Sequence, residues 1–134
     1  MVIDSSALLS ILLNEIDART IAQAIREDAR RLVSAGTLLE ASMVIESRRG
    51  LGMESLDALL DEYDAEVIAF TPKQAQIARR AFRKFGKGRH PANLNFGDCI
   101  AYALARDTGE PLLFKGTDFG QTDIDVVELP VGGM

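Results

Sequence analysis

Four acidic residues of this chain lie beside or inside apolar segments, and this placement restricts the folds that the chain can adopt. They are Asp4 in MVID, Glu40 in TLLEASMVI, Asp98 in FGDCIAYALA and Asp118 in PLLFKGTDF. A carboxylate that becomes buried must be paired or bind a metal, because an isolated charge is very unfavourable in an apolar environment. A fold that gathers the four acids would therefore create a site for a hard cation.

Three of these acids also have an ordinary structural interpretation. Asp4 can cap the helix that follows it, Asp98 lies in the first turn of a predicted helix, and Asp118 in GTDFG can belong to a turn. Glu40 is different, because nearly all of its neighbours in the segment LLEASMV are apolar. Two unit charges about 4 Å apart repel by roughly 4 kcal/mol at an effective dielectric constant of about 20. Clustered acids therefore imply shared protons or a bound cation.

The chemistry expected of such a cluster is phosphodiester hydrolysis. Sites made only of oxygen ligands suit Mg²⁺ or Mn²⁺, and such a cation polarises a phosphate and activates a water. In this hypothesis Asp4, Glu40 and Asp98 hold one cation. Asp118 helps to hold a second cation or binds its water. Asp123, in QTDID, is either a further outer ligand or a surface acid.

The composition predicts one folded α/β domain over residues 1–134. Hydrophobic residues make up 47% of the chain and charged residues 26%, which is sufficient for a core. The single cysteine excludes an intrachain disulfide and a cysteine-cluster zinc site, and the single histidine leaves little for a catalytic triad. No apolar stretch approaches the ~20 residues that cross a bilayer, and the N-terminus has no basic leader region. We therefore expect a cytoplasmic protein without membrane contact.

Strand-like and helix-like segments alternate along the chain. Strands are predicted at residues 1–4, 31–35, 66–70, 112–114 and 125–129, and helices at 5–14, from 17, at 37–50, 54–63, 72–86 and 97–107. This alternation is typical of a parallel sheet with helices on both faces, where ligands bind beyond the carboxyl ends of the strands. Asp4 and Asp118 each follow a predicted strand, so they face the same crevice if those strands are neighbours.

The charge is unevenly distributed. A net charge of −5 alone argues against nucleic-acid binding. However, residues 79–90 contain six arginines or lysines and one histidine, without an acid. This run is either a solvated helix face or a surface that contacts phosphates. On the second interpretation the candidate RNA contacts are Arg83, Lys84, Lys87, Arg89 and Lys115.

Two apolar surfaces are candidates for partner binding. The first predicted helix has apolar residues around most of its circumference, which exceeds what one core face needs. This helix and the residues Leu56, Leu59 and Leu60 are candidates for a dimer surface.

These segments resemble the PIN-domain ribonucleases of the VapC type, the toxins of bacterial type II toxin–antitoxin modules. The resemblance is carried by VIDSSALLSIL, TLLEASMVIE, GKGRHPANLNFGDCIAYALA and PLLFKGTDFGQTDI, and runs nearly from end to end. It implies a three-layer α/β/α PIN-like domain with a central parallel sheet. It also implies that the four acids line the site with Asp123 close by, and that Ser6 and Thr117 hydrogen-bond the acids and orient them.

The resemblance further implies an activity and partners. The family cleaves RNA with Mg²⁺ or Mn²⁺, often tRNA or ribosomal RNA, and so inhibits translation and growth. Its members are commonly homodimers and form hetero-oligomers with a VapB-type antitoxin, whose C-terminal segment wraps the toxin. The apolar first helix would then form the antitoxin groove. The acids would attract an arginine of the partner, because a guanidinium pairs with carboxylates through two hydrogen bonds.

Three alternatives remain open at the level of sequence. A binding module would use the acids for a structural cation or a basic partner, and would cut nothing. A phosphotransfer receiver domain also gathers acids at strand ends, but expects adjacent acids early in the chain, whereas Asp4 is followed by Ser5 and Ser6. Lys115 only loosely matches its late lysine. A deoxyribonuclease would use the same phosphodiester chemistry. Activity that disappears with EDTA and returns with manganese would exclude the binding module.

Overall fold

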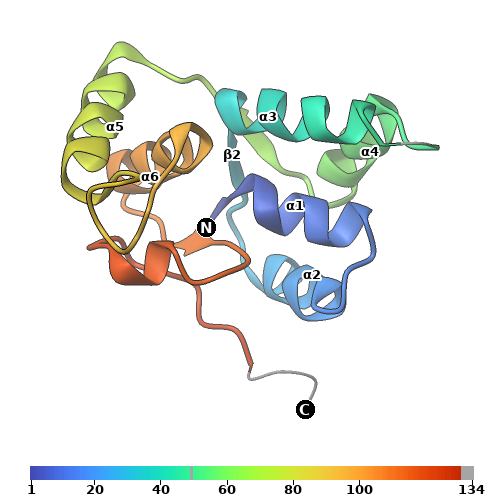
Figure 1. The fold of residues 1–134 in the computed structure, drawn as a ribbon. Coiled ribbons are helices and arrows are strands. Elements are labelled where there is room, and N and C mark those ends of the chain that lie inside the picture. Colours follow the sequence, from blue (N-terminus) through green and yellow to red (C-terminus); the bar gives the residue numbers. More distant parts are fainter. Residues whose placement is uncertain (49, 131–134) are drawn as a thin grey trace.

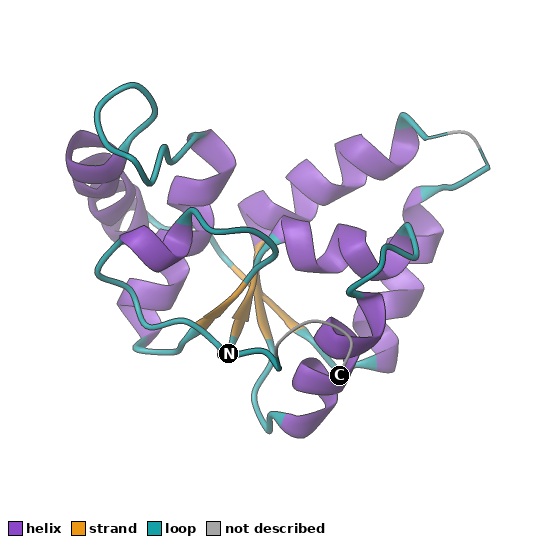
Figure 2. Ribbon diagram, turned by 60° about the horizontal axis from the view of Figure 1, so that its bottom comes forward, coloured by secondary structure: helices purple, strands orange, loops and turns teal. Residues whose placement is uncertain are grey.

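A parallel sheet lies between two groups of helices in the computed structural model, which describes residues 1–48 and 50–130 (Figures 1 and 2). The strands are β1 (Val2–Ile3), β2 (Leu32–Ser34), β3 (Glu66–Ile68) and β4 (Leu112–Leu113). Their order is β3-β2-β1-β4, and all neighbouring strands are parallel. The predicted α/β/α class is confirmed.

Helices follow each of the first three strands, as the alternating pattern predicts. They are α1 (Ser5–Leu12), α2 (Ala18–Glu27), α3 (Ala35–Glu46), α4 (Met53–Glu62), α5 (Pro72–Phe85), α6 (Phe96–Thr108) and the short 3-10 helix η1 (Phe119–Gln121). Among the described residues, no helix has the length and apolar character needed to cross a membrane.

The two faces of the sheet are covered by different helices, because successive residues of a strand point to opposite sides. One core packs against α1, α2 and α4 and includes the strand residues Ile3, Val33 and Leu113. The other packs against α5 and α6 and includes the strand residues Val2, Leu32 and Leu112. Figure 2 shows the corresponding division of the helices on either side of the strands.

Capping residues explain where two helices begin. Asp4, and not a serine, caps α1, since its Oδ2 accepts a hydrogen bond from the amide of Ser6. Ser34 at the end of β2 accepts one from the amide of Gly36, so α3 begins two residues before the predicted start at Thr37. In both cases the residue that ends a strand also starts the next helix.

The strand predicted at 125–129 is wrong. Val126 forms only an isolated bridge to Leu112, supported by one backbone hydrogen bond on each side of it. Because β4 is only two residues long, a longer ladder has no partner residues beyond this position.

The proposed dimer contacts on α4 are also wrong. Leu56, Leu59 and Leu60 are all less than 9% exposed and belong to the core beside the sheet. Their spacing reflects the inner face of α4, because residues three or four apart lie on the same side of a helix. They are not available to a second copy in this fold.

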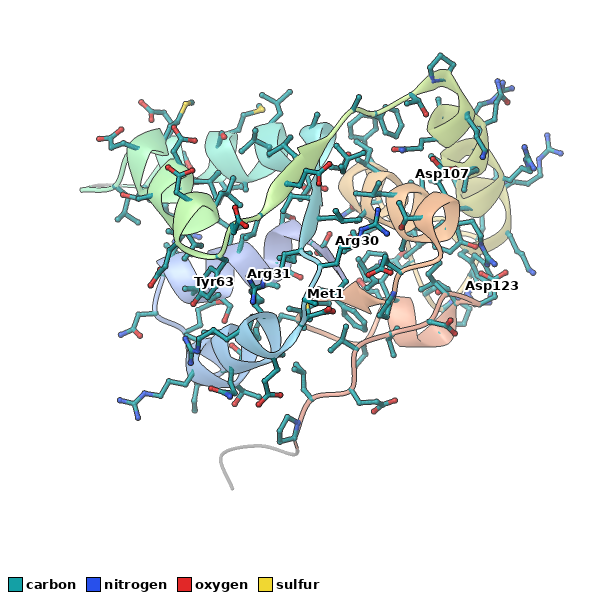
Figure 3. The ribbon with its side chains drawn as sticks, turned by 180° about the vertical axis from the view of Figure 1, so that it is seen from behind. Met1, Arg30, Arg31, Tyr63, Asp107 and Asp123 are labelled. Atoms are coloured by element: carbon teal, nitrogen blue, oxygen red, sulfur yellow. The ribbon has the colours of Figure 1, made fainter. Side chains whose placement is uncertain are left out.

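Arg31 connects three elements on the face seen in Figure 3. Its guanidinium donates to the carbonyl oxygens of Ile25 at 2.8 Å and Arg26 at 3.0 Å, near the end of α2. It also donates to the carbonyl of Tyr63 at 2.8 Å, at the end of α4. A cation placed there supplies donors to carbonyl groups at the C-terminal ends of two helices, where amide donors of the helix run out.

Candidate functional site

Asp4 is the most deeply buried of the candidate acids. It is 4% exposed, and its Oδ2 accepts hydrogen bonds from the amide of Ser6 at 3.1 Å and the hydroxyl of Ser6 at 2.7 Å. Its other oxygen, Oδ1, is buried without a hydrogen-bond partner among the described residues. The pKa of Asp4 is raised to about 7, mainly by burial and to a lesser extent by the negative charges of Asp98 and Glu40, against the lowering effect of the Ser6 hydrogen bonds.

Ser6 also ties Asp4 to the neighbouring strand. Its hydroxyl oxygen accepts a hydrogen bond of 2.9 Å from the amide of Lys115, just after β4. Because β1 and β4 are adjacent, this single side chain links the residues that follow both strands. The result is a fixed orientation for the Asp4 carboxylate.

Glu40 lies on α3 with its carboxylate against the start of α6. Its Oε1 is buried and has no hydrogen-bond partner among the described residues. A Cβ atom added to Gly97 would lie 2.1 Å from Oε2 and 2.6 Å from Oε1 of Glu40. Glycine at position 97 therefore leaves the space that the Glu40 carboxylate occupies, one residue before Asp98.

Asp98 is held at the start of α6 by a reciprocal pair of hydrogen bonds. Its Oδ2 accepts from the amide of Asn95 at 3.0 Å, and Oδ1 of Asn95 accepts from the amide of Asp98 at 2.9 Å. Burial raises the pKa of Asp98, and the charges of Asp118 and Glu40 act in the same direction, against the amide of Asn95. The role of Asn95 was missed at the sequence level, although N-x-x-D before an apolar run resembles a capping box.

Asp118 and Thr117 lie in the exposed segment after β4. Asp118 precedes η1 and is close enough to raise the pKa of Asp98, for which burial is the larger cause. In the described residues the Thr117 hydroxyl has no hydrogen bond to any of the acids. The predicted orienting role of Thr117 therefore stays a prediction.

Asp123 occupies a different environment. Its Oδ1 accepts hydrogen bonds from the Tyr102 hydroxyl at 2.5 Å and the Arg106 guanidinium at 2.8 Å, and its Oδ2 is 3.8 Å from Nζ of Lys84. Partial burial acts to raise the pKa of Asp123, but these partners hold it below the usual range. Asp123 is thus engaged by cations and a phenol rather than by the other acids.

The donor chemistry of the four acids fits a hard cation. They interact electrostatically: the charges of Asp98 and Glu40 raise the pKa of Asp4. The charges of Asp118 and Glu40 raise the pKa of Asp98. Burial is the larger cause in both cases. Two of their oxygens are buried without a partner, and carboxylate oxygens are preferred ligands of Mg²⁺ and Mn²⁺. Coordination geometry is not formed, however. Within residues 1–48 and 50–130, no three acidic, histidine or cysteine side chains are grouped so that they could hold a metal ion.

The candidate RNA-contacting cations fall into two groups. Lys115 is 3.1 Å from a carboxylate oxygen of Glu15, and Lys84 is 3.8 Å from one of Asp123. Arg83, Lys87 and Arg89 are exposed on α5 and the loop after it, and form no ion pair with any described residue. Among these candidates, only the second group can contact phosphates without breaking an existing ion pair.

Comparisons with known proteins agree with this fold. The family model for the PIN domain matches residues 1–125. Ribonuclease VapC30 of Mycobacterium tuberculosis is 48% identical over 131 residues, which are 97% of this chain and 100% of that protein.

Solved structures share the architecture. The crystal structure of M. tuberculosis VapC20, described as a Sarcin-Ricin loop cleaving toxin, superposes with a TM-score of 0.78 at 15% identity and covers 96% of this chain and 98% of that one. A toxin–antitoxin complex from Klebsiella pneumoniae gives a TM-score of 0.71 at 16% identity, covering 94% and 95%. At these identities the structures establish the fold alone. Together with the sequence matches over nearly the whole chain, they lead to one conclusion: the chain belongs to the PIN-domain family, and within it to the VapC-type proteins.

Proposed function

We propose that this chain is an Mg²⁺- or Mn²⁺-dependent endoribonuclease that acts as the toxin of a toxin–antitoxin module. The observation that carries the proposal is the electrostatic coupling among Asp4, Glu40, Asp98 and Asp118. Asp4 and Asp118 follow the adjacent parallel strands β1 and β4, while Glu40 lies on α3 and Asp98 lies in the first turn of α6. The close relative named as a ribonuclease supports RNA as the substrate.

The residues divide the work of holding the cation. Asp4, Glu40 and Asp98 would provide its carboxylate ligands, and Asp118 would bind a second cation or a water. When bound, such a cation neutralises charge on the phosphate and activates a water. Ser6 keeps the Asp4 carboxylate oriented. Asn95 does the same for Asp98.

The chain's cations would bring RNA to this acidic site. The exposed Arg83, Lys87 and Arg89 would contact phosphates and offset the repulsion between RNA and the net negative protein. We propose tRNA or ribosomal RNA as the target, in line with the solved structure described as a Sarcin-Ricin loop cleaving toxin. Cleavage of either would stop translation in the cytoplasm.

The proposed partners are an antitoxin and a second copy of the chain. Several apolar side chains of α1 and its C-terminal cap remain half-buried, namely Leu9, Ile11, Leu12 and Leu13. An amphipathic antitoxin segment would cover them. An arginine of that segment would reach the acids. A solved toxin–antitoxin complex with this fold supports such an assembly.

Cleavage of total RNA tests the proposal. Wild-type protein with manganese should produce discrete fragments, and EDTA should abolish them. Asp98→Asn should not cut, because it loses ligand charge, whereas Asp57→Asn, an exposed acid on α4, should cut like the wild type. Manganese should also raise the melting temperature of the wild type, since a ligand of the folded state stabilises it.

Two outcomes would reject the assignment. Wild-type rates in Asp98→Asn would exclude the proposed ligand set. The absence of both RNA cleavage and any rise in melting temperature with manganese would favour the binding module instead.

A further inference from the structure

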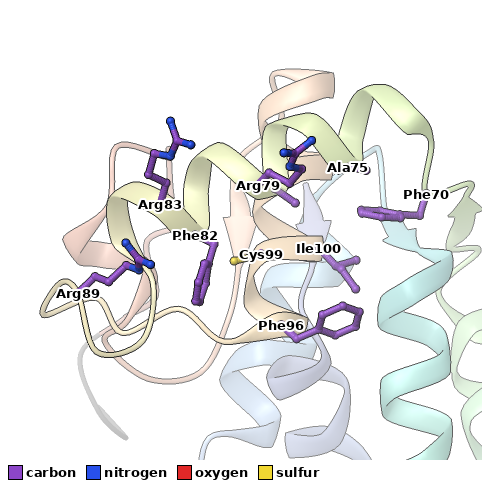
Figure 4. Close-up of a pocket in the computed structure, with 10 residues that line it drawn as sticks. Phe70, Ala75, Arg79, Phe82, Arg83, Arg89, Phe96, Cys99 and Ile100 are labelled. Carbon is purple, nitrogen blue, oxygen red and sulfur yellow. The ribbon is translucent and has the colours of Figure 1, made fainter.

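A pocket of about 670 Å³ opens between α5 and the first turn of α6 (Figure 4). Aromatic and cationic side chains dominate its lining, namely Phe70, Phe82, Phe96, Arg79, Arg83 and Arg89. Figure 4 shows the ring of Phe82 between Arg89 and Cys99, and the ring of Phe96 below Ile100. The pocket therefore combines flat apolar surfaces with positive charge.

Two aromatic rings of this pocket remain exposed to solvent instead of being buried in the core. Phe96 is 84% exposed, and Phe82 is 40% exposed. Phe96 therefore adds little to the stability of the fold, since apolar stabilisation scales with the area that is buried, whereas Phe82 is partly covered and still presents part of its ring. These rings are thus available to a ligand.

The pocket and the acidic site both include residues from the first turn of α6. Phe96 is the first residue of that helix, and Asp98 is its third. Gly97 between them lies against the carboxylate of Glu40. Residues two apart on a helix point to different sides, so an RNA whose base stacks on Phe96 would pass around the start of α6 to bring its adjoining phosphate to the acids.

The charge around the pocket is complementary to a polyanion. Arg79, Arg83 and Arg89 line it, and no acidic residue of the described chain does. The Arg89 guanidinium lies 5.6 Å from the centre of the Phe82 ring, in a cation–π contact.

We infer that this pocket binds an unpaired base of the RNA next to the phosphodiester that is cut. The inference rests on the nuclease function proposed above and names the substrate class, single-stranded or loop RNA. Phe96 and Phe82 stack on the base, and the arginines contact the flanking phosphates. Proteins recognise single-stranded RNA by this combination, since every base has a π-face while bases in a duplex are already stacked.

Binding of fluorescein-labelled RNA decamers tests the inference directly. The probes are decauridylate and a decamer of equal charge that lacks its central bases, both measured by fluorescence anisotropy in EDTA so that nothing is cut. Phe96→Leu keeps an apolar side chain but removes the ring, and should weaken decauridylate binding roughly tenfold. It should leave the affinity for the abasic decamer unchanged.

Two further variants separate stacking from charge and from general surface effects. Arg89→Gln should weaken the binding of both decamers and reduce the salt dependence of log K by about 1, because it removes one phosphate contact. Ile16→Ala removes a fully exposed apolar side chain from the loop between α1 and α2. This control should bind both decamers as the wild type does.

Several results would overturn the base pocket. One is that wild type and Phe96→Leu bind decauridylate with equal affinity. Another is that Phe96→Leu loses as much affinity for the abasic decamer as for decauridylate. A third is that the wild-type protein binds neither probe. A sedimentation change from dimer to monomer in Phe96→Leu, with RNA binding intact, would reassign the surface to a contact between copies. Base-dependent binding without RNA cleavage would instead support the pocket and reject the nuclease.

Discussion

The buried carboxyl of Asp4 makes the stability of the metal-free protein depend on pH in an unusual direction. Burial raises its pKa from 3.8 to about 7, so the folded protein binds a proton more tightly than the unfolded chain does. Between these two pH values the folded state holds the proton and the unfolded state has lost it. The free energy of unfolding must therefore fall as the pH rises through this window, and level off above it.

The size of this effect follows from the two pKa values. At about 1.36 kcal/mol per pH unit, a pKa of about 7 in place of 3.8 corresponds to a loss of roughly 4 kcal/mol by neutral pH. This is a large share of the total stability of a small domain, which is typically about 5–15 kcal/mol. Asp98, whose pKa burial also raises, contributes with the same sign.

Comparison with Asp4→Asn isolates the contribution. Urea unfolding would be followed by circular dichroism in EDTA, because the chain has no tryptophan. The variant cannot ionise at position 4, so its stability relative to wild type should increase from pH 4 to pH 7 by roughly 3 kcal/mol. Carboxyls with a lowered pKa, such as Asp17 and Asp28, lose their contribution at lower pH in both proteins and cancel in the difference. Parallel pH profiles for wild type and Asp4→Asn would refute the reasoning.

Three other variants probe the site and its support. Gly97→Ala should abolish cleavage while the protein stays folded, because the new Cβ displaces the flexible end of Glu40; Gly120→Ala, which meets no atom within 4 Å, should cut normally in the same RNA assay. Arg31→Ala should lower the free energy of unfolding in urea by roughly 2–4 kcal/mol, since three carbonyl oxygens lose a charged donor. Asp123→Asn should retain cleavage within about threefold, because this acid binds Tyr102 and Arg106; a complete loss of cleavage would return it to the ligand set.

The order of the elements was predictable because each one carries its own local signal. Residues Ile21, Ala22 and Ile25 have helical spacing and are all buried on α2. Pro72 begins α5 as its missing amide allows. The strand order was not predictable in this way, because it depends on pairing between residues far apart in the chain. The incorrect strand at 125–129 has the same origin, since its apolar residues are compatible with pairing but its neighbour β4 is too short.

The site was predictable in its acids but not in its supports. Asp4 and Glu40 are conspicuous because a charge beside apolar residues needs a compensating interaction. Gly97 gave no such signal, because its importance lies in a close approach between α3 and α6 that only the packed structure contains. The exposure of Phe96 could not be predicted either, since an apolar residue at the start of a helix normally belongs to the core.

The repulsion among the buried carboxylates links the proposed cation and the proposed antitoxin. A folded protein that leaves Asp4 Oδ1 and Glu40 Oε1 buried without partners is less stable than its core would otherwise allow. A divalent cation would relieve this penalty, and so would a partner's guanidinium, because both place positive charge against the same oxygens. Binding of either one removes the repulsion that would favour binding of the other, so the cation and the guanidinium should compete for the site. An inhibitor acting in this way would need no contact with RNA, because occupying the carboxylates is sufficient to keep the cation out.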